Sequence, residues 1–261
     1  MVERTLPDYD NPPAVETALG LRFSPIEGWN VFHYGALLQK FKNKYPKHEL
    51  RPPIGEITFQ FSPESDFSNL PVRCWFLNED NTQLVQIQNN CFIRNWRRAD
   101  ETASYLHYDV VRPLFQDDWS TFQRFLEEEG LPKPSIWQCE VTYVNHFVRG
   151  REWHDFRDLH ELYPAWAGLP AVGLFARPEM VSFSLSYSLP DGSGMLQFAS
   201  QPGVRKADGA EIIQLTITAL GKPLSSQESD IFAWLDKGRS AVVTGFRQFT
   251  SEQVNRLWGL K

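Results

Sequence analysis

The chain has 261 residues, of which 42% are hydrophobic and 22% charged, and its formal net charge is −6. This length allows one large domain or two smaller ones with a buried core, and the acidic balance disfavours general affinity for nucleic acid or anionic membranes. The first residues lack the basic start and apolar run of a signal peptide, and no apolar stretch approaches the roughly 20 residues of a membrane-spanning helix. We therefore expect a cytoplasmic globular protein.

The first half of the chain alternates apolar and polar residues over several short segments separated by turn residues. Such alternation predicts strands, and a period of 3.6 predicts helices. We expect strands at 14–23, 56–61, 72–77, 83–88 and 91–97, and helices at 32–44 and 111–126. The pair Asn89-Asn90 is typical of a tight hairpin turn. Tyr45-Pro46 is a suitable helix stop, because the residue before proline avoids helical geometry.

The second half begins after a proline-containing joint at 130–134 and shows a similar order of segments. We expect strands at 139–147, 171–176, 181–189, 195–200 and 211–220, and helices at 153–163 and 231–249. In the long helix, Gly238 and Gly245 would let a neighbouring backbone approach closely. Thr250 and Gln253 have the spacing of a capping box for a last short helix.

Matched features in the two halves indicate an internal repeat. Trp29 follows Glu16 by 13 residues, and Trp153 follows Glu140 by 13 residues. The predicted order in each half is β-α-β-β-β-β-α. We therefore predict an α+β fold made by tandem duplication of a β-α-β4-α unit, with repeats at 1–131 and 132–261 that could also form one continuous globular domain. Antiparallel sheets each packed by a long helix would result, an order that resembles the TATA-binding-protein-like and helix-grip architectures.

Four stretches together resemble a sporadically distributed bacterial family of about 260-residue proteins of unknown function. These stretches are LPDYDNPPAVETALGLRF, LVQIQNNCFIRNWRR, CEVTYVNHF and FRQFTSEQVNRLWG. The resemblance implies a cytoplasmic bacterial protein that is patchily inherited, as accessory components of defence or toxin–antitoxin-like loci are. It supplies no catalytic residues.

The sequence shows no catalytic motif. No G-x-S-x-G nucleophile pattern is present, and the cysteines Cys74, Cys91 and Cys139 lie in strand-like runs, which is typical of reduced, buried thiols. The mid-strand Glu16 and Glu140 are expected to lie on a solvated face or to pair with arginine. We therefore favour a non-enzymatic protein and predict no cofactor.

A metal site is the main catalytic alternative. On a helix, His154, Asp158 and Glu161 would share one face, and divalent metals bind such sets of imidazole and carboxylate. The same spacing is also typical of a solvated polar face, with Arg157 forming ion pairs within the helix. These three residues are weak candidates for a metal-dependent hydrolase.

A cluster of arginine, tryptophan and glutamine follows the predicted hairpin. The candidate partner-binding residues are Gln86, Gln88, Arg94, Trp96, Arg97 and Arg98. Strand alternation puts Arg94, Trp96 and Arg98 on one face and Arg97 on the other, with Gln86 and Gln88 nearby across the turn and with Arg73 and Trp75 on the preceding strand. A sheet face that carries arginine, glutamine and flat aromatic side chains could bind a planar or anionic group by stacking and bidentate hydrogen bonds. Alternatively, the guanidinium and indole groups stack on one another structurally, or the arginines pair with the surplus acids.

These observations favour a binding or interaction protein. The expected partner is a protein from the same locus or a small anionic, nucleotide-like ligand. Nucleic-acid binding through a curved sheet is an alternative that the net charge disfavours. No membrane partner is expected, and a homodimer is an alternative to a monomer.

Overall fold

The computed structural model describes residues 6–55, 68, 72–100, 103–166 and 178–261. Two compact units are present, and they are interleaved along the chain: unit 1 contains residues 1–17, 141–221 and 233–261, and unit 2 contains residues 18–140 and 222–232. The predicted strands at 56–61 and 171–176 lie outside the described residues. The proposed repeats at 1–131 and 132–261 stay a prediction.

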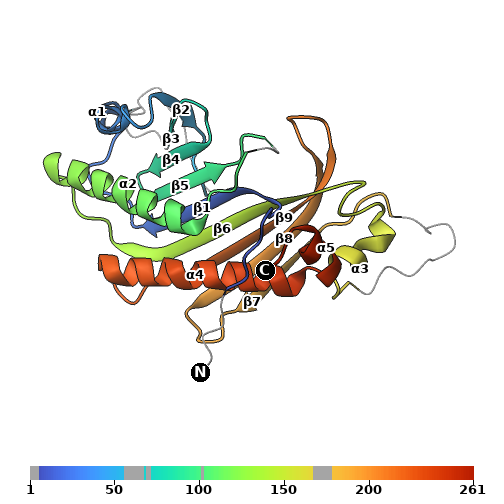
Figure 1. Ribbon diagram of the computed structural model, residues 1–261. Helices are drawn as coiled ribbons and strands as arrows, with labels where there is room; N and C mark the ends of the chain where they lie inside the picture. Colours follow the sequence, from blue (N-terminus) through green and yellow to red (C-terminus); the bar gives the residue numbers. More distant parts are fainter. Residues whose placement is uncertain (1–5, 56–67, 69–71, 101–102, 167–177) are drawn as a thin grey trace. The chain divides into compact units, whose positions relative to one another are not determined.

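The described residues form strands and helices in an α+β arrangement (Figure 1). The strands are β1 Ala14–Phe23, β2 Lys47–Arg51, β3 Arg73–Leu77, β4 Gln83–Gln88, β5 Cys91–Arg97, β6 Ile136–Val148, β7 Phe183–Ser188, β8 Gly194–Val204 and β9 Glu211–Gly221. The helices are α1 Phe32–Phe41, α2 Tyr108–Glu128, the 3-10 helix η2 Phe156–Asp158, α3 Leu159–Leu162, α4 Glu228–Phe249 and α5 Glu252–Leu257. Hydrogen-bonded strands follow the order β2-β3-β4-β5-β1-β6-β9-β8-β7. The boundaries between the units fall inside β1 and β6, and each of these two strands therefore contributes residues to both units. The predicted α+β class is confirmed.

Burial of apolar side chains explains why the predicted strands form: β4 and β5 are buried on both faces, whereas β6 is buried at alternate residues. The bounds of β1, β4 and β5 are those predicted, and in β6 every second residue from Cys139 to Phe147 is buried. By contrast, β2 was not predicted, because all five residues of its sequence KHELR are exposed and show no alternation. It pairs antiparallel with β3.

In unit 2, α1 and α2 cover one face of the strands with an aromatic layer. The ring centroid of Phe92 on β5 lies 5.2 to 5.6 Å from those of Phe115, Trp119 and Phe122 on α2. Aromatic pairs at this separation add to the free energy gained by burying their apolar area. Side chains that alternate with Phe92 therefore point to the opposite face of the sheet.

In unit 1, α4 packs closely on its strands. The Phe249 ring on α4 stacks on Phe198 of β8 at 4.5 Å. A Cβ on Gly245 would lie 2.6 Å from a terminal methyl group of Leu196, so a larger residue would force that side chain to shift; the close neighbour is a side chain and not the predicted backbone. The cap of α5 also differs from the prediction: Ser251, not Thr250, accepts the Val254 N–H.

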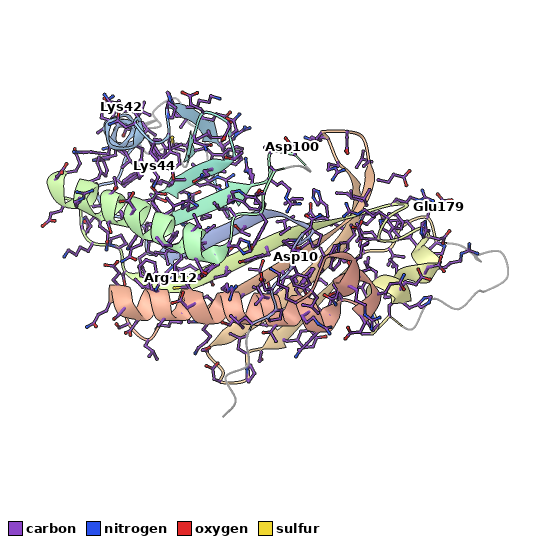
Figure 2. All side chains as sticks on the ribbon, in the orientation of Figure 1. Asp10, Lys42, Lys44, Asp100, Arg112 and Glu179 are labelled. Atoms are coloured by element: carbon purple, nitrogen blue, oxygen red, sulfur yellow. The ribbon has the colours of Figure 1, made fainter. Side chains whose placement is uncertain are left out.

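Both ends of the chain are joined within unit 1. The Tyr9 hydroxyl donates to Asn255 Oδ1 at 2.6 Å, and the Asp10 N–H donates to the carbonyl of Gly259 at 3.1 Å. Figure 2 labels Asp10, whose carboxylate also pairs with Lys261 at 3.0 Å. Two stretches that are far apart in sequence are therefore bound to each other.

Within the described residues, each helix is too short or too polar to cross a bilayer.

Candidate functional site

The register of β4 and β5 divides the predicted binding residues between two faces. Gln86 lies opposite Ile93 and Gln88 lies opposite Cys91, whereas Arg94 lies opposite Val85. Directly opposed residues share a face. Gln86 and Gln88 therefore point away from Arg94, and the prediction of one Arg/Trp/Gln face is wrong.

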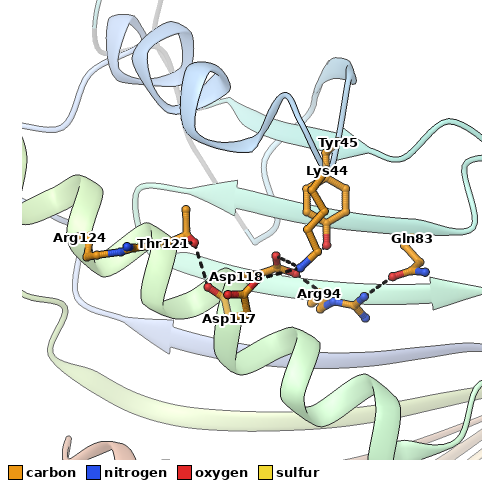
Figure 3. A network of polar contacts seen from close by, with 8 residues as sticks. All are labelled: Lys44, Tyr45, Gln83, Arg94, Asp117, Asp118, Thr121 and Arg124. Carbon is orange, nitrogen blue, oxygen red and sulfur yellow. Dashed lines mark hydrogen bonds and ion pairs between the residues drawn. The ribbon is translucent and has the colours of Figure 1, made fainter.

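Arg94 is fully buried in a polar network under the helices (Figure 3). Its Nε donates to Asp118 Oδ2 at 3.0 Å, and its Nη2 donates to the side chain of Gln83. The Tyr45 hydroxyl donates to the same Asp118 oxygen at 2.6 Å, and Lys44 Nζ donates to Oδ1 at 2.7 Å. Three donors thus surround one buried carboxylate.

This network stabilises the fold by linking α2 to two neighbouring elements. Burial, and next the negative charge of Asp118, raise the pKa of Tyr45, so its hydroxyl stays protonated and acts as a donor. Asp118 on α2 thereby fixes the turn after α1 and the middle of β5. Arg94 occupies the role that we gave as the alternative, an arginine paired with one of the acids.

The other residues predicted on the β5 strand lie in different surroundings. Trp96 is 5% exposed and packs edge-to-face against Tyr105 at 5.4 Å. Arg98 is half-buried and engaged with other groups. On the opposite face, Gln88 accepts the Ile54 N–H at 2.9 Å and donates to Asn90 at 2.7 Å. Of the predicted set, only Arg97 belongs to the cluster described next, and Gln86 is a hydrogen-bond partner of one of its arginines.

The opposite face of unit 2 carries three arginines around one indole ring. We define the Trp75–arginine cluster as Trp75 and Arg73 of β3, Arg51 of β2 and Arg97 of β5. The guanidinium carbons of Arg51, Arg97 and Arg73 lie 4.6, 4.7 and 5.4 Å from the Trp75 ring centroid. Contacts of this kind are cation–π interactions. Arg51 was missed because β2 has no strand pattern.

Arg73 is held in place by neutral partners. Its Nη1 donates to Gln86 Oε1 at 2.8 Å, and Gln86 in turn donates to Asn95 Oδ1 at 2.6 Å. Its Nε is buried and has no hydrogen-bond partner among the described residues. Burial lowers the pKa of Arg73, and the positive charges of Arg22, Arg51 and Arg97 lower it further. The surroundings of Arg73 are thus electropositive.

Carboxylates on this face are paired with the neighbouring arginines. Glu49 forms an ion pair with Arg51, and Glu140 pairs with Arg22 at 3.5 Å. Glu140 therefore follows the prediction of pairing with arginine. Among the described residues, Arg73 forms no ion pair. An anion could accept hydrogen bonds there from a guanidinium group that the described residues leave without a carboxylate partner.

The candidate metal residues are not aligned. His154 lies in a bend, Asp158 ends the 3-10 helix η2, and only Glu161 lies in α3. The prediction that they share one helical face is wrong, because the Asp155 side chain accepts the Arg157 N–H and starts the helix later. Over the described part of the chain, no group of three His, Cys, Asp or Glu side chains is placed to hold a metal ion.

All three cysteines are buried and free, as predicted. Burial raises the pKa of Cys74 and of Cys139 to about 12, and it also raises that of Cys91. These thiols therefore stay protonated at neutral pH.

A separate pocket of about 630 Å³ lies in unit 1. Its walls include Arg149, Trp153, Met180, Val204 and Glu211. Arg149 pairs with Glu211 and donates from Nε to the carbonyl of His154 at 3.0 Å. Its charge is thus already compensated, whereas Arg73 forms no ion pair with any residue that the structure describes.

Comparison with protein-family models gives no match, and comparison with curated proteins gives none either. The resemblance to a sporadically distributed bacterial family stays a prediction.

Proposed function

We propose that this chain is a non-enzymatic binding protein that holds an anionic partner at the Trp75–arginine cluster. The observation that carries this proposal is Arg73, which lies among other arginines and forms no ion pair among the described residues. A guanidinium group forms its strongest hydrogen bonds with carboxylate or phosphate. The partner is an acidic protein from the same locus or a small anionic, nucleotide-like ligand.

The proposed tandem duplication gives this surface its scaffold. In support, each half begins with a long strand and a short helix and closes with hairpin-linked strands and a long helix. The first strand of each half also neighbours the last, as β1 neighbours β5 and β6 neighbours β9. In experimental coordinates, superposition of β1–α2 on β6–α4 should align β5 with β9, as in TATA-binding-protein-like or helix-grip folds. Failure of that alignment would contradict the duplication.

Capture from native cell extract tests the function. The full chain should retain a protein or small-molecule partner, and Arg73→Gln should lose it while keeping its melting temperature. Arg124→Gln is the matched control, because Arg124 is an exposed arginine on α2, the helix that packs on the Phe92 side of the sheet. Equal retention by the Arg73→Gln variant would contradict the proposal. Recovery of nucleic acid in place of these partners would favour the alternative function.

A further inference from the structure

We infer that the Trp75–arginine cluster binds a phosphate group of a small molecule, with Trp75 serving as a spacer between arginines and not as a stacking platform for the ligand. This inference rests on the proposed function and narrows its ligand. It combines three observations: the surroundings of the indole ring, the directions of the arginines, and the state of Arg73.

Trp75 already stacks with guanidinium groups. Arg51 pairs in register with Arg73, at the beginning of β3. The Arg97 N–H donates to the carbonyl of Thr82 at 2.7 Å, which places Arg97 beyond Leu77, the last residue of β3. Arg51 and Arg97 thus reach the ring from opposite ends of β3, both at less than 5 Å from its centroid. A base or other planar group would have to displace one of them in order to stack.

The arginines of this face come from separate strands. Arg22 is on β1, Arg51 on β2, Arg73 on β3 and Arg97 on β5. The charges of Arg22, Arg51 and Arg97 all act on Arg73, so an anion bound at Arg73 would be attracted by arginines from four strands. A planar carboxylate matches a single guanidinium fork, whereas a phosphate offers three acceptor oxygens in a tetrahedral arrangement. The geometry thus favours a tetrahedral dianion.

Arg73 is the centre of this arrangement. Its charge is partly desolvated and surrounded by like charges, which lower its pKa, and Gln86 is a neutral partner. The Nε of Arg73 is buried and has no hydrogen-bond partner among the described residues, so an anion would accept from the outer nitrogens of the guanidinium group. A bound dianion would offset the repulsion among the arginines.

Calorimetric titration of the full chain near neutral pH tests the inference. The probes are inorganic phosphate, sulfate, succinate, adenosine 5'-monophosphate and cytidine 5'-monophosphate. We expect phosphate and sulfate to compete for one site. Because the base of a nucleotide does not stack on Trp75 in this arrangement, the affinities of the two nucleotides should agree within about threefold. Arg73→Gln should weaken phosphate binding by about 10- to 100-fold, as expected for the loss of hydrogen bonds to a charged group.

Two further variants make the result specific. Arg73→Lys keeps the charge but removes the fork, and its phosphate affinity should lie between those of the wild type and Arg73→Gln. Arg124→Gln should bind as the wild type does. If the Arg73 variant unfolds, Arg97→Gln provides the same test on another arm of the cluster.

The outcomes separate this inference from the proposed function. Arg73-dependent binding of succinate without binding of phosphate overturns the phosphate assignment but leaves an anion-binding protein. A strong preference for one base overturns the spacer role of Trp75. Absence of binding by all probes overturns the inference, and the capture experiment then decides whether the proposed function fails as well.

Discussion

At the scale of single residues, Asp118 of unit 2 combines a buried negative charge with several hydrogen-bond donors. It is 1% exposed and accepts hydrogen bonds from Lys44, Tyr45 and Arg94. Removal of one partner of a buried ion pair is costly, because the other charge is left desolvated and uncompensated. The side chain of its neighbour Asp117 is 70% exposed and pairs with the same Lys44.

Asp118→Ala should therefore lower the free energy of unfolding by about 3–5 kcal/mol, since Arg94 would stay buried without its counter-ion. Asp117→Ala is the matched control and should cost about 1 kcal/mol or less, as exposed ion pairs do. Urea denaturation of both variants measures the difference. Equal costs would show that the network in Figure 3 does not hold α1, β5 and α2 together.

His146 on β6 provides a residue-scale prediction for pH. Burial lowers the pKa of His146 below its usual 6.5, opposed by a hydrogen bond with Gln214, while the charges of Arg205 and Asp208 act in opposite directions. The unfolded chain therefore binds the proton more readily than the folded one. Stability from this group is present above about pH 6.5 and is lost as pH falls toward the folded pKa.

We expect the free energy of unfolding to decrease from neutral pH to about pH 5 more steeply in the wild type than in His146→Gln. Chemical denaturation across this range measures both slopes. Parallel curves would mean that His146 titrates alike in the folded and unfolded states.

At the scale of secondary-structure elements, the sequence predicted the positions of the strands better than it predicted which side chains lie on which face of the sheet. The short apolar-rich runs bounded by turn residues defined β4 and β5 correctly, although the two strands are buried along almost their whole length and not at every second residue. The same sequence could also have placed Gln86 and Gln88: a two-residue turn at Asn89-Asn90 sets Gln88 opposite Cys91 and hence Gln86 opposite Ile93. The face that the helices cover is indicated by Phe92, an aromatic residue that lies on the same face of β5 as Arg94.

Other elements could not be predicted from local patterns. β2 owes its existence to pairing with β3, a tertiary contact, and so Arg51 was missed. The helix predicted at 153–163 is broken because Trp153 is fixed by a hydrogen bond from its Nε1 to the carbonyl of Phe147. Such contacts override helical periodicity.

Helix α4 supplies the element-scale prediction. A methyl group at Gly245 would meet Leu196 at 2.6 Å and Phe198 at 3.0 Å, and the overpacking should cost about 1–3 kcal/mol. This cost should exceed the helix propensity of about 1 kcal/mol that alanine gains, so Gly245→Ala should destabilise the fold. Gly35 on α1 is the control, because an added methyl group meets nothing within 4 Å there. Gly35→Ala should stabilise by about 1 kcal/mol through helix propensity. Thermal unfolding compares the two variants, and a stabilising effect at Gly245 would contradict the close packing of α4.

At the scale of the whole molecule, the net charge of −6 weakens the attraction of anions to the Trp75–arginine cluster. A long polyanion must approach the whole acidic surface, whereas a single phosphate meets mainly the local field of the cluster. We expect a single-stranded oligonucleotide to bind more weakly than a nucleoside monophosphate at physiological salt. Fluorescence anisotropy with a labelled oligonucleotide measures this. Tight binding with a steep salt dependence would favour the nucleic-acid alternative.

The most direct measurement of the central claim is the position of a bound tetrahedral dianion. Tungstate resembles phosphate in shape and charge and scatters anomalously, so crystals soaked in it report where the anion lies. We predict an anomalous peak within hydrogen-bonding distance of the Arg73 guanidinium, beside Trp75, and its loss in Arg73→Gln crystals. A peak elsewhere on the molecule, or one that persists in the variant, would contradict the account.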